Sequence, residues 1–420
     1  MRITKLILEQ FRNYRHLELS FDAREPMTYI VGPNAQGKTN ILESIYVLAL
    51  TKSFRTGNQQ DMIGWDDEYA RVKGFFEIAA TNTALRAAAD SGRPGKEADG
   101  QAEAMELECF LGKPPHPRKA FRKNSVKTGA ANFIGNCQVV FFHPEDLNML
   151  YLGPDLRRAY LNVMNVQVNR KYFTALRAYQ KVLKQRNALL HAIRENRMNG
   201  EGHAMEDELD IWDEQLVEHG SYLMLERSKT VNHFEQKLAE TYRKISDGDE
   251  KISIIYRHTL AGAAAGDSQS QTLQDWHDLF AEQLAKTRAR DLQALVTTVG
   301  PHRDDLEFSL NGLKLAALAS RGEYRSLLLA LKLIELEFFE EQSGQKPILL
   351  LDDVFSELDP KRQTLLLGAI NGHQTIITTT HIDRHHQGLK SGRPGKLLEI
   401  HQGTIHEQTA GSGHCYRIWG

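Results

Sequence analysis

Apolar and polar residues alternate along much of the N-terminal third of the chain, with the period of two that is typical of β-strands. This pattern predicts strands at 2–9, 16–21, 69–79, 104–112 and 118–128. Two shorter runs, 27–32 and 138–142, are apolar at nearly every position and indicate strands that are buried on both faces. A helix is predicted at 38–51, and the segment 81–104, rich in Ala, Gly and charge, is predicted to be a disordered hairpin tip.

The period changes to three or four after Gly153, which indicates long helices. Helices are predicted at 155–196, 205–245, 274–294, 323–342 and 360–369, and strands at 251–258, 347–351 and 374–380. We therefore predict an α/β fold that an α-helical lobe interrupts. The α/β lobe would consist of residues 1–154 plus 296–420, and the helical insert of residues 155–295.

Composition and charge are those of an ordinary globular protein. Charged residues make up 25% of the chain and hydrophobic residues 41%, and the net charge is −2, which excludes a disordered chain and a uniformly basic nucleic-acid coat. Cys109, Cys137 and Cys415 lie too far apart for a zinc site or a disulfide framework. The chain has neither the roughly 18 consecutive apolar residues of a transmembrane helix nor a signal peptide, so we expect a cytoplasmic protein without a membrane partner.

A phosphate-binding loop follows the apolar strand at 27–32. The residues Gly32, Pro33, Asn34, Ala35, Gln36, Gly37, Lys38 and Thr39 match the pattern G-x-x-x-x-G-K-[ST] in full. Its glycines let the backbone turn so that amide groups and the N-terminus of the next helix point at phosphates. We expect Lys38 to contact the β- and γ-phosphates of ATP, and Thr39 to be a ligand of Mg²⁺.

A second apolar run, Ile348–Leu351, ends in the acids Asp352 and Asp353, which is the form of a Walker B strand. A carboxylate at the end of a buried strand needs a positive partner, so Asp352 is the candidate Mg²⁺ ligand. Asp353 is the candidate that orients or deprotonates the attacking water. The alternative is a pair of acids that cap a helix. Because the helical insert separates this run from Lys38, the insert must loop out and return if both halves form one site.

Three further segments stand where ABC-type ATPases carry their motifs. Ser320, Gly322 and Glu323 open a helix at the place of the signature, Asp359 lies at the place of the D-loop, and His381 follows a strand as a switch histidine does. The chain therefore resembles the ABC-type P-loop ATPase heads of the SMC-like class. The resemblance implies that His381 senses the γ-phosphate, and that the signature residues contact ATP held by a second copy of the chain.

Longer segments narrow the resemblance to the RecF family of bacterial recombination-repair proteins. These segments are Phe11–Tyr14, Gly32–Asn40, His143–Leu147, Gly153–Arg158, Gly300–Leu306 and Ser320–Arg325. The resemblance implies that Arg12 and Asn40 join the ATP site. It also implies an ATP-dependent homodimer that binds DNA at single-strand gaps and works with RecR and RecO to place RecA there, with roles in replication restart and SOS induction.

Asp353 stands where most ABC heads have a glutamate, which is one methylene longer. The shorter side chain holds the attacking water less well. We therefore expect slow ATP hydrolysis, which suits a switch that opens the dimer rather than a motor.

Two stretches without acids are candidates for contacts with DNA phosphates. The candidate residues are Lys119, Arg122 and Lys123 within 111–130, and Lys171, Arg177 and Lys181 in the helix after Asn169, whose basic stretch also includes Arg170, Lys184 and Arg186. Either stretch is equally well explained as a solvated basic surface. Arg157 and Arg158 either contact DNA or buttress the lobes, and the sequence alone does not distinguish between these roles.

Three other functions fit parts of the pattern. A transporter ATPase subunit needs a membrane partner, and its signature follows the phosphate loop much sooner. An SMC or nuclease-linked head carries coiled-coil arms that are far longer than the insert found here. A DNA-binding scaffold with an inactive ATP site is the third, and the presence of Lys38, Thr39, Asp352 and Asp353 argues against it.

Overall fold

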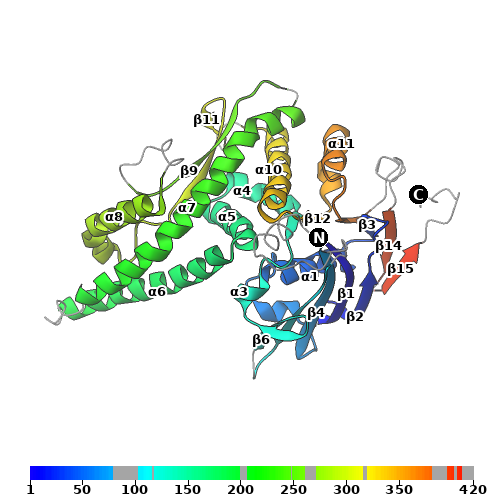
Figure 1. Ribbon diagram of the computed structural model, residues 1–420, viewed down its shortest axis with the longest axis horizontal. Helices are drawn as coiled ribbons and strands as arrows, with labels where there is room; N and C mark the ends of the chain where they lie inside the picture. The colour runs from blue at the N-terminus through cyan, green and yellow to red at the C-terminus, as the bar shows by residue number, and fades with distance from the viewer. Residues whose placement is uncertain are drawn as a thin grey trace, which may run out of the picture. The chain divides into compact units, whose positions relative to one another are not determined.

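The chain forms two compact units (Figure 1). The computed structural model describes residues 1–78, 103–115, 118–198, 206–246, 248–260, 271–315, 319–380, 395–401 and 404–408. The first unit, called the α/β unit below, consists of Met1–Asp146 and Leu328–Gly420, and the second, the helical unit, of Leu147–Leu327. Among the described residues, no helix is long and apolar enough to cross a membrane.

An antiparallel sheet is formed by the alternating pattern of the N-terminal sequence. Its strands are β1 (Arg2–Phe11), β2 (Tyr14–Ser20), β4 (Tyr69–Ile78), β5 (Glu103–Gly112), β6 (Arg118–Lys123) and β7 (Val126–Thr128), in the order β2-β1-β4-β5-β6-β7. In β1, Leu6, Leu8 and Phe11 are fully buried, and the residues between them are half-buried. One face of the sheet therefore belongs to the core, as the alternation predicts.

A second, mostly parallel sheet positions the candidate site. Its strands are β3 (Met27–Val31), β8 (Val139–Phe142), β12 (Ile348–Asp352), β13 (Thr375–Thr379), β14 (Gly395–His401) and β15 (Thr404–Gln408), in the order β15-β14-β3-β13-β12-β8. All neighbours are parallel except β14 and β15. The carboxyl ends of parallel strands lie at one edge, so the residues that follow β3, β8 and β12 meet there.

Helix α1 (Lys38–Leu50) packs against strands of both sheets and is buried along nearly its whole length. From Ile41 onward every residue of α1 is buried and most are apolar, so this helix lies inside the unit. The α/β unit also contains α11 (Pro360–Ala369), the part of α10 (Arg321–Ser343) from Leu328 onward, and several short helices. The short helices are η1 (Gln59–Met62), α3 (Ala130–Phe133), η2 (Pro144–Leu147, which ends one residue past the unit) and η4 (Val354–Glu357).

The helical unit is built around two long helices that pack along each other, α6 and α7 (Figure 1). Its elements are α4 (Asn148–Tyr151), α5 (Pro154–Val168), α6 (Arg170–Met198), α7 (Glu206–Ile245), α8 (Leu273–Ala294), the start of α10, and the sheet β11-β10-β9. The strands of that sheet are β9 (Ile252–Arg257), β10 (Asp305–Leu310) and β11 (Leu313–Lys314). Trp276, Phe280 and Phe234 are among the buried aromatic side chains of its core.

The helical pattern at 155–196 contains a break between two helices, the second of which begins after Asn169. Asn169 adopts an extended conformation, with φ −132° and ψ 98°, and separates α5 from α6. Its side-chain oxygen accepts a hydrogen bond from the backbone N–H of Tyr172 at 2.9 Å, so it caps the start of α6. The apolar spacing continues across the break, which is why periodicity alone did not reveal it.

The unit boundaries also differ from the predicted ones, and fall after Asp146 and after Leu327 instead of after residues 154 and 295. The boundary lies after Leu327 and not after residue 295 because β10, which was not predicted, pairs antiparallel with β9 of the helical unit. Strands β11, β14 and β15 were not predicted either. Most of the predicted tip at 81–104 lies outside the described residues, and its last two residues begin β5.

Candidate nucleotide site

The phosphate-binding loop predicted from the sequence joins the end of β3 to the start of α1. Ala35 and Gly37 adopt the left-handed conformation, with φ of 63° and 103°. A Cβ added to Gly37 would lie 2.5 Å from the side chain of Asn13, and one added to Gly32 would lie 2.5 Å from the carbonyl oxygen of Ile400. Gly37 is therefore required where the chain turns, and Gly32 where the backbone of Ile400 approaches the loop closely.

Lys38 holds its ammonium inside this loop and is only 7% exposed. Its Nζ donates hydrogen bonds to the carbonyl oxygens of Gly32 at 2.5 Å and Pro33 at 2.8 Å. Burial lowers the pKa of Lys38 from its usual value, and the charges of Asp353 and Asp352 counteract part of this effect. The loop thus presents a desolvated cation among backbone groups, which is the arrangement that binds phosphates.

The predicted Mg²⁺ ligands Thr39 and Asp352 meet at the edge of the parallel sheet. Thr39 Oγ1 donates to Asp352 Oδ1 at 2.9 Å, and Thr378 Oγ1 donates to the same oxygen at 2.5 Å. Nε2 of His143 lies 3.5 Å from the other carboxylate oxygen. Asp352 is 5% exposed, so hydroxyl groups from two elements stabilise a buried carboxylate.

A hydroxyl and a carboxylate at this distance fit Mg²⁺, which prefers oxygen ligands and shares them with phosphates. The described part of the chain contains no group of three His, Cys, Asp or Glu side chains that could hold a metal ion. An ion at Thr39 and Asp352 would therefore complete its coordination with the ligand or with water.

Asp353 follows β12 with a positive φ of 52° and precedes the short helix η4. Its backbone N–H donates to the carbonyl oxygen and to the hydroxyl of Thr378, both at 3.1 Å. Its side chain makes no capping hydrogen bond to η4. Asp353 therefore stands at the N-cap position of η4 without a side-chain hydrogen bond to that helix, and it is one of the residues that line the cavity.

One cavity of about 540 Å³ brings these groups together. It is lined by the loop residues Asn34, Ala35, Gln36, Gly37, Lys38, Thr39 and Asn40, by Asp352 and Asp353, and by Arg55, His143, Pro144 and Glu145. This volume lies within the usual range of small-molecule sites. The edge of an α/β sheet beyond the carboxyl ends of its strands is also the usual position of such a site.

Arg55, His143, Pro144 and Glu145 were not among the predicted site residues. The signal for the last three was present, because they follow the buried strand β8 and β8 pairs parallel with β12. Arg55 had no comparable signal. It comes from the loop after α1, and its guanidinium donates to Asn40 Oδ1 at 2.8 Å.

Arg12, predicted for the ATP site, is not among the residues that line this cavity. Its guanidinium binds Glu43 of α1 through two hydrogen bonds, of 2.8 and 2.6 Å. Glu43 is fully buried, so Arg12 supplies the charge that this carboxylate needs inside the unit.

The neighbours of Arg12 brace the phosphate loop. Asn13 Nδ2 donates to the carbonyl oxygen of Gln36 at 3.1 Å. The hydroxyl of Tyr14 donates to the carbonyl oxygen of Gly37, also at 3.1 Å. Asn40 Nδ2 donates to Asn13 Oδ1 at 2.7 Å. The turn between β1 and β2 therefore fixes the loop from outside.

The predicted signature residues Ser320 and Glu323 form a capping box at the start of α10. The N–H of Ser320 donates to Glu323 Oε2 at 2.6 Å, and the N–H of Glu323 donates to Ser320 Oγ at 3.3 Å. Gly322 lies in the first turn, where an added Cβ would lie 3.9 Å from Ser320 Oγ, an ordinary contact. Asp359 caps α11 by accepting from the N–H of Arg362 at 3.0 Å, and His381 lies outside the described residues.

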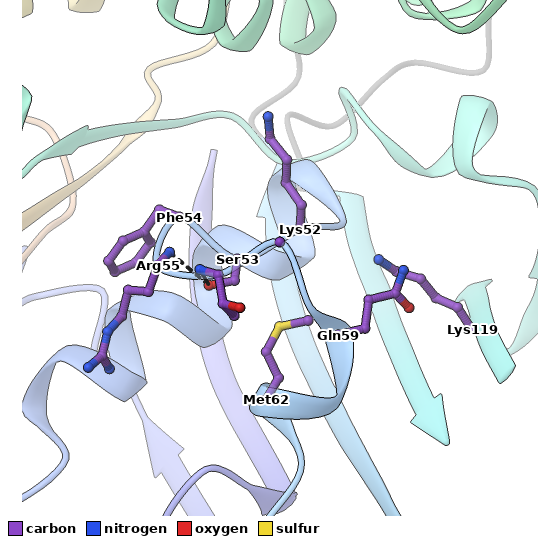
Figure 2. A pocket seen from close by; sticks show the side chains of 9 residues that line it. Lys52, Ser53, Phe54, Arg55, Gln59, Met62 and Lys119 are labelled. Carbon is purple, nitrogen blue, oxygen red and sulfur yellow. Dashed lines mark hydrogen bonds between the residues drawn. The ribbon is translucent and has the colours of Figure 1, made fainter. Parts of the chain in front are cut away.

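A second cavity, of about 410 Å³, lies beside the end of α1 (Figure 2). Lys119, a predicted DNA contact, lines it and donates a hydrogen bond to the carbonyl oxygen of Thr51. Arg55 lines both cavities, and Figure 2 shows its guanidinium pointing away from Lys119. Burial lowers the pKa of Lys119 from its usual value.

The other predicted DNA contacts of β6 also have partners within the protein. Arg122 lies 3.2 Å from Glu108, which faces it across the strand pair, and Lys123 Nζ donates to Asn136 Oδ1 at 2.5 Å. These contacts are those expected of a structural basic surface. A role of Lys119, Arg122 and Lys123 in DNA binding stays a prediction.

Helix α6 divides the second predicted cluster between its surface and its interior. Lys171 and Arg177 lie over the rings of Tyr222 and Phe173, and Lys181 is exposed. Arg186 is fully buried, and its guanidinium hydrogen-bonds to Asp213 at 2.5 Å, to Asp291 at 2.8 Å and to Thr297 at 2.9 Å. Arg186 is therefore not available to DNA phosphates in this fold, in contrast to the sequence-based expectation.

Arg157 and Arg158 brace the helical unit. Arg157 binds both carboxylate oxygens of Asp305, at 2.6 and 2.9 Å, and Arg158 donates to the carbonyl oxygen of Asp304 at 2.7 Å. These contacts join α5 to the start of β10. Of the two roles left open by the sequence, the structure shows the bracing one.

The comparisons with known proteins agree with this geometry. The family model of the RecF/RecN/SMC N-terminal domain matches residues 2–92. The DNA replication and repair protein RecF of Bacillus mycoides (strain KBAB4) is 36% identical over 408 residues, which cover 96% of this chain and 98% of that protein. The RecF protein of Bacillus cereus (strain G9842) matches with the same identity and coverage.

Solved structures give the same result. The recombination mediator protein RecF of the RecFOR pathway, with ATPrS, has a TM-score of 0.81 at 30% identity, over 97% of this chain and 98% of that one. The same protein with ATP has a TM-score of 0.81 at 31% identity, over 97% of both chains. An Smc head bound to the C-winged helix domain of ScpA, at 15% identity over 98% of both chains and a TM-score of 0.50, shares the fold alone. The predicted fold, an SMC-like ABC-type ATPase head with a helical insert, is confirmed.

Proposed function

This chain belongs to the RecF family of DNA replication and repair proteins, and on that basis we propose that it is an ATP-binding protein of recombinational repair. The observation that carries the proposal is the hydrogen bond of 2.9 Å between Thr39 and Asp352, because it joins the phosphate loop to the Walker B acids. The cavity that they line with Lys38 is suited to a triphosphate. The structure of RecF with ATP supports the choice of nucleotide.

The predicted site residues would have separate roles. Lys38 and the amides of the phosphate loop bind the phosphates, and Thr39 and Asp352 hold Mg²⁺, which neutralises phosphate charge when bound. Asp353 orients the attacking water, and His381 senses the γ-phosphate. Arg12 acts on this site through Glu43 of α1, since its guanidinium is engaged there.

We propose further that ATP joins two copies of the chain. Ser320, Gly322 and the N-terminus of α10 would contact the γ-phosphate held by the partner, so that hydrolysis removes the contact and opens the dimer. The closed dimer would bind DNA at single-strand gaps in the cytoplasm, with phosphate contacts from the basic residues of β6 and α6. It would work with RecR and RecO in placing RecA, and in SOS induction.

The test is a comparison of mass and DNA affinity in three nucleotide states. With ATP and Mg²⁺ we expect a dimer by light scattering, and tighter binding of gapped than of single-stranded or duplex DNA. With ADP or without nucleotide we expect a monomer and weaker binding. Equal mass and equal DNA affinity in all three states would contradict the proposed switch.

The identity of residue 353 makes a separate prediction about rate. We expect the wild-type protein with gapped DNA to hydrolyse ATP more slowly than about 10 s⁻¹, the median of enzymes. Asp353→Glu should be faster, because the longer side chain reaches the water better, and Asp353→Asn slower. A steady-state phosphate-release assay measures all three. A wild-type rate above that value, or a slower Asp353→Glu variant, would contradict the expectation.

A further inference from the structure

Trp65 is presented to solvent in the α/β unit. Its exposed fraction is 95%, the highest among the large apolar side chains of the described residues. By contrast, Trp276 is fully buried, and Trp212 is partly buried against the helical core. Exposed tryptophan is costly in water, and it is enriched at the centres of protein interfaces, where it contributes much of the binding energy.

The loop that carries Trp65 is held in place on both sides. The N–H of Gly64 donates to the carbonyl oxygen of Gln10 at 2.8 Å, and Ile63 forms a β-bridge with Phe11. Lys113 Nζ donates to the carbonyl oxygens of both Gly64 and Trp65 at 2.9 Å. A fixed backbone lowers the entropy that a partner must remove on binding, so this indole is preorganised for contact.

The three residues that follow Trp65 in the sequence are acidic. Asp66, Asp67 and Glu68 follow it directly, and Asp66 and Glu68 are exposed. An acidic flank repels the phosphates of DNA and favours a positively charged protein surface. An indole with a rim of carboxylates therefore fits a protein that offers an apolar pocket beside basic residues.

A short path leads from this loop to the phosphate loop. The N–H of Arg12 donates to the carbonyl oxygen of Met62 at 2.9 Å, so the segment before Trp65 pairs with the turn between β1 and β2. The next residue of that turn, Asn13, bonds to Gln36 and Asn40 of the phosphate loop. A protein bound at Trp65 would thus contact a segment that is connected to the phosphate loop through the turn between β1 and β2.

We propose that Trp65 and its acidic flank are the docking site for a basic protein partner, and that docking is coupled to nucleotide binding through the turn at Asn13. The inference rests on the proposed function, which names RecR as the partner, and RecR is the probe for its test. Coupling between sites is reciprocal, so ATP must change the affinity for RecR by the same factor as RecR changes the affinity for ATP.

The experiment measures RecR affinity by calorimetry for four full-length proteins, each with and without ATP. We expect Trp65→Ala to bind RecR at least tenfold more weakly than wild type. The charge reversal Asp66→Lys with Glu68→Lys should weaken binding and reduce its salt dependence. The matched control is Leu313→Ala, which removes another exposed apolar side chain, 58% exposed in β11, and should bind as wild type does. ATP should change wild-type affinity about fivefold or more.

The outcomes separate the docking site from the proposed function. Equal RecR affinity of wild type and Trp65→Ala would overturn the docking site and leave RecR as a partner. No RecR binding by wild type would overturn both the docking site and the proposed partnership with RecR. A Trp65→Ala variant that loses affinity for gapped DNA but not for RecR would show that the indole stacks on a base, which also overturns the proposal. Equal wild-type affinity with and without ATP would overturn the coupling.

Discussion

Lys38→Met is expected to weaken ATP binding about 100-fold, or ~2.7 kcal/mol. The ammonium of Lys38 lies inside the phosphate loop, 2.5 Å from the carbonyl oxygen of Gly32 and 2.8 Å from that of Pro33. Methionine keeps a long unbranched stem but removes the charge and all three donors. The phosphates would then lose their charge-assisted hydrogen bonds in a desolvated site, where such bonds are strongest. Calorimetric titration with ATP and Mg²⁺ measures the effect.

The matched control for this variant is Lys5→Met. Lys5 lies in β1 and forms a surface ion pair with Glu18, so its removal should leave ATP affinity unchanged. Thermal unfolding without nucleotide checks that both variants remain folded. Affinity of Lys38→Met within about threefold of wild type would show that the triphosphate does not bind at this loop.

The parts of the site that follow from chain continuity were predictable. The phosphate loop is one contiguous motif, and the apolar runs before it and before Asp352 identify two buried strands. Parallel pairing then places the ends of such strands at one edge, so Thr39 and Asp352 meet. The same rule would have added His143 to the site, since it follows a third buried strand.

Residues whose roles depend on partners distant in sequence were not predictable. Arg12 was expected at the nucleotide and is bound to Glu43, and Arg157 is bound to Asp305 far along the chain. A local pattern shows that an arginine is present but not which carboxylate it meets. Strand β10 is a similar case, because its pairing with β9 crosses the whole of α8. Because of this pairing, the helical unit extends past the predicted boundary at residue 295 and ends at Leu327.

Basic residues counted along a helix illustrate the same limit. The charges of α6 suggested one cationic surface, but Arg186 turns inward while Lys181 and Lys184 stay exposed. Because the helix has 3.6 residues per turn, positions along it point in different directions. The acids that neutralise Arg186 come from α7 and α8, so the sequence around α6 contains no sign of them.

Arg186→Met is expected to lower the free energy of unfolding of the helical unit by about 3–5 kcal/mol. Arg186 is fully buried and bonded to Asp213, Asp291 and Thr297. Without the guanidinium, two carboxylates would remain in the interior without their cation. Burial already raises the pKa of Asp213 from its usual value, and the loss of the arginine should raise it further. A carboxyl group with a raised pKa in the folded state destabilises the fold as pH rises, so the loss should shrink at acid pH. Urea unfolding from neutral to acid pH, followed by circular dichroism, measures the loss of unfolding free energy at each pH.

Two further variants separate a structural role from a DNA-binding one. Lys184→Met removes an exposed charge two residues away on the same helix and should unfold as wild type does. Adding Asp213→Asn and Asp291→Asn to Arg186→Met should restore much of the lost stability, because neutral amides replace the unpaired carboxylates. If Arg186→Met instead unfolded like wild type and weakened binding to gapped DNA, the arginine would have to leave its buried site to meet phosphate. The assignment of this network to the interior of the helical unit would then be wrong.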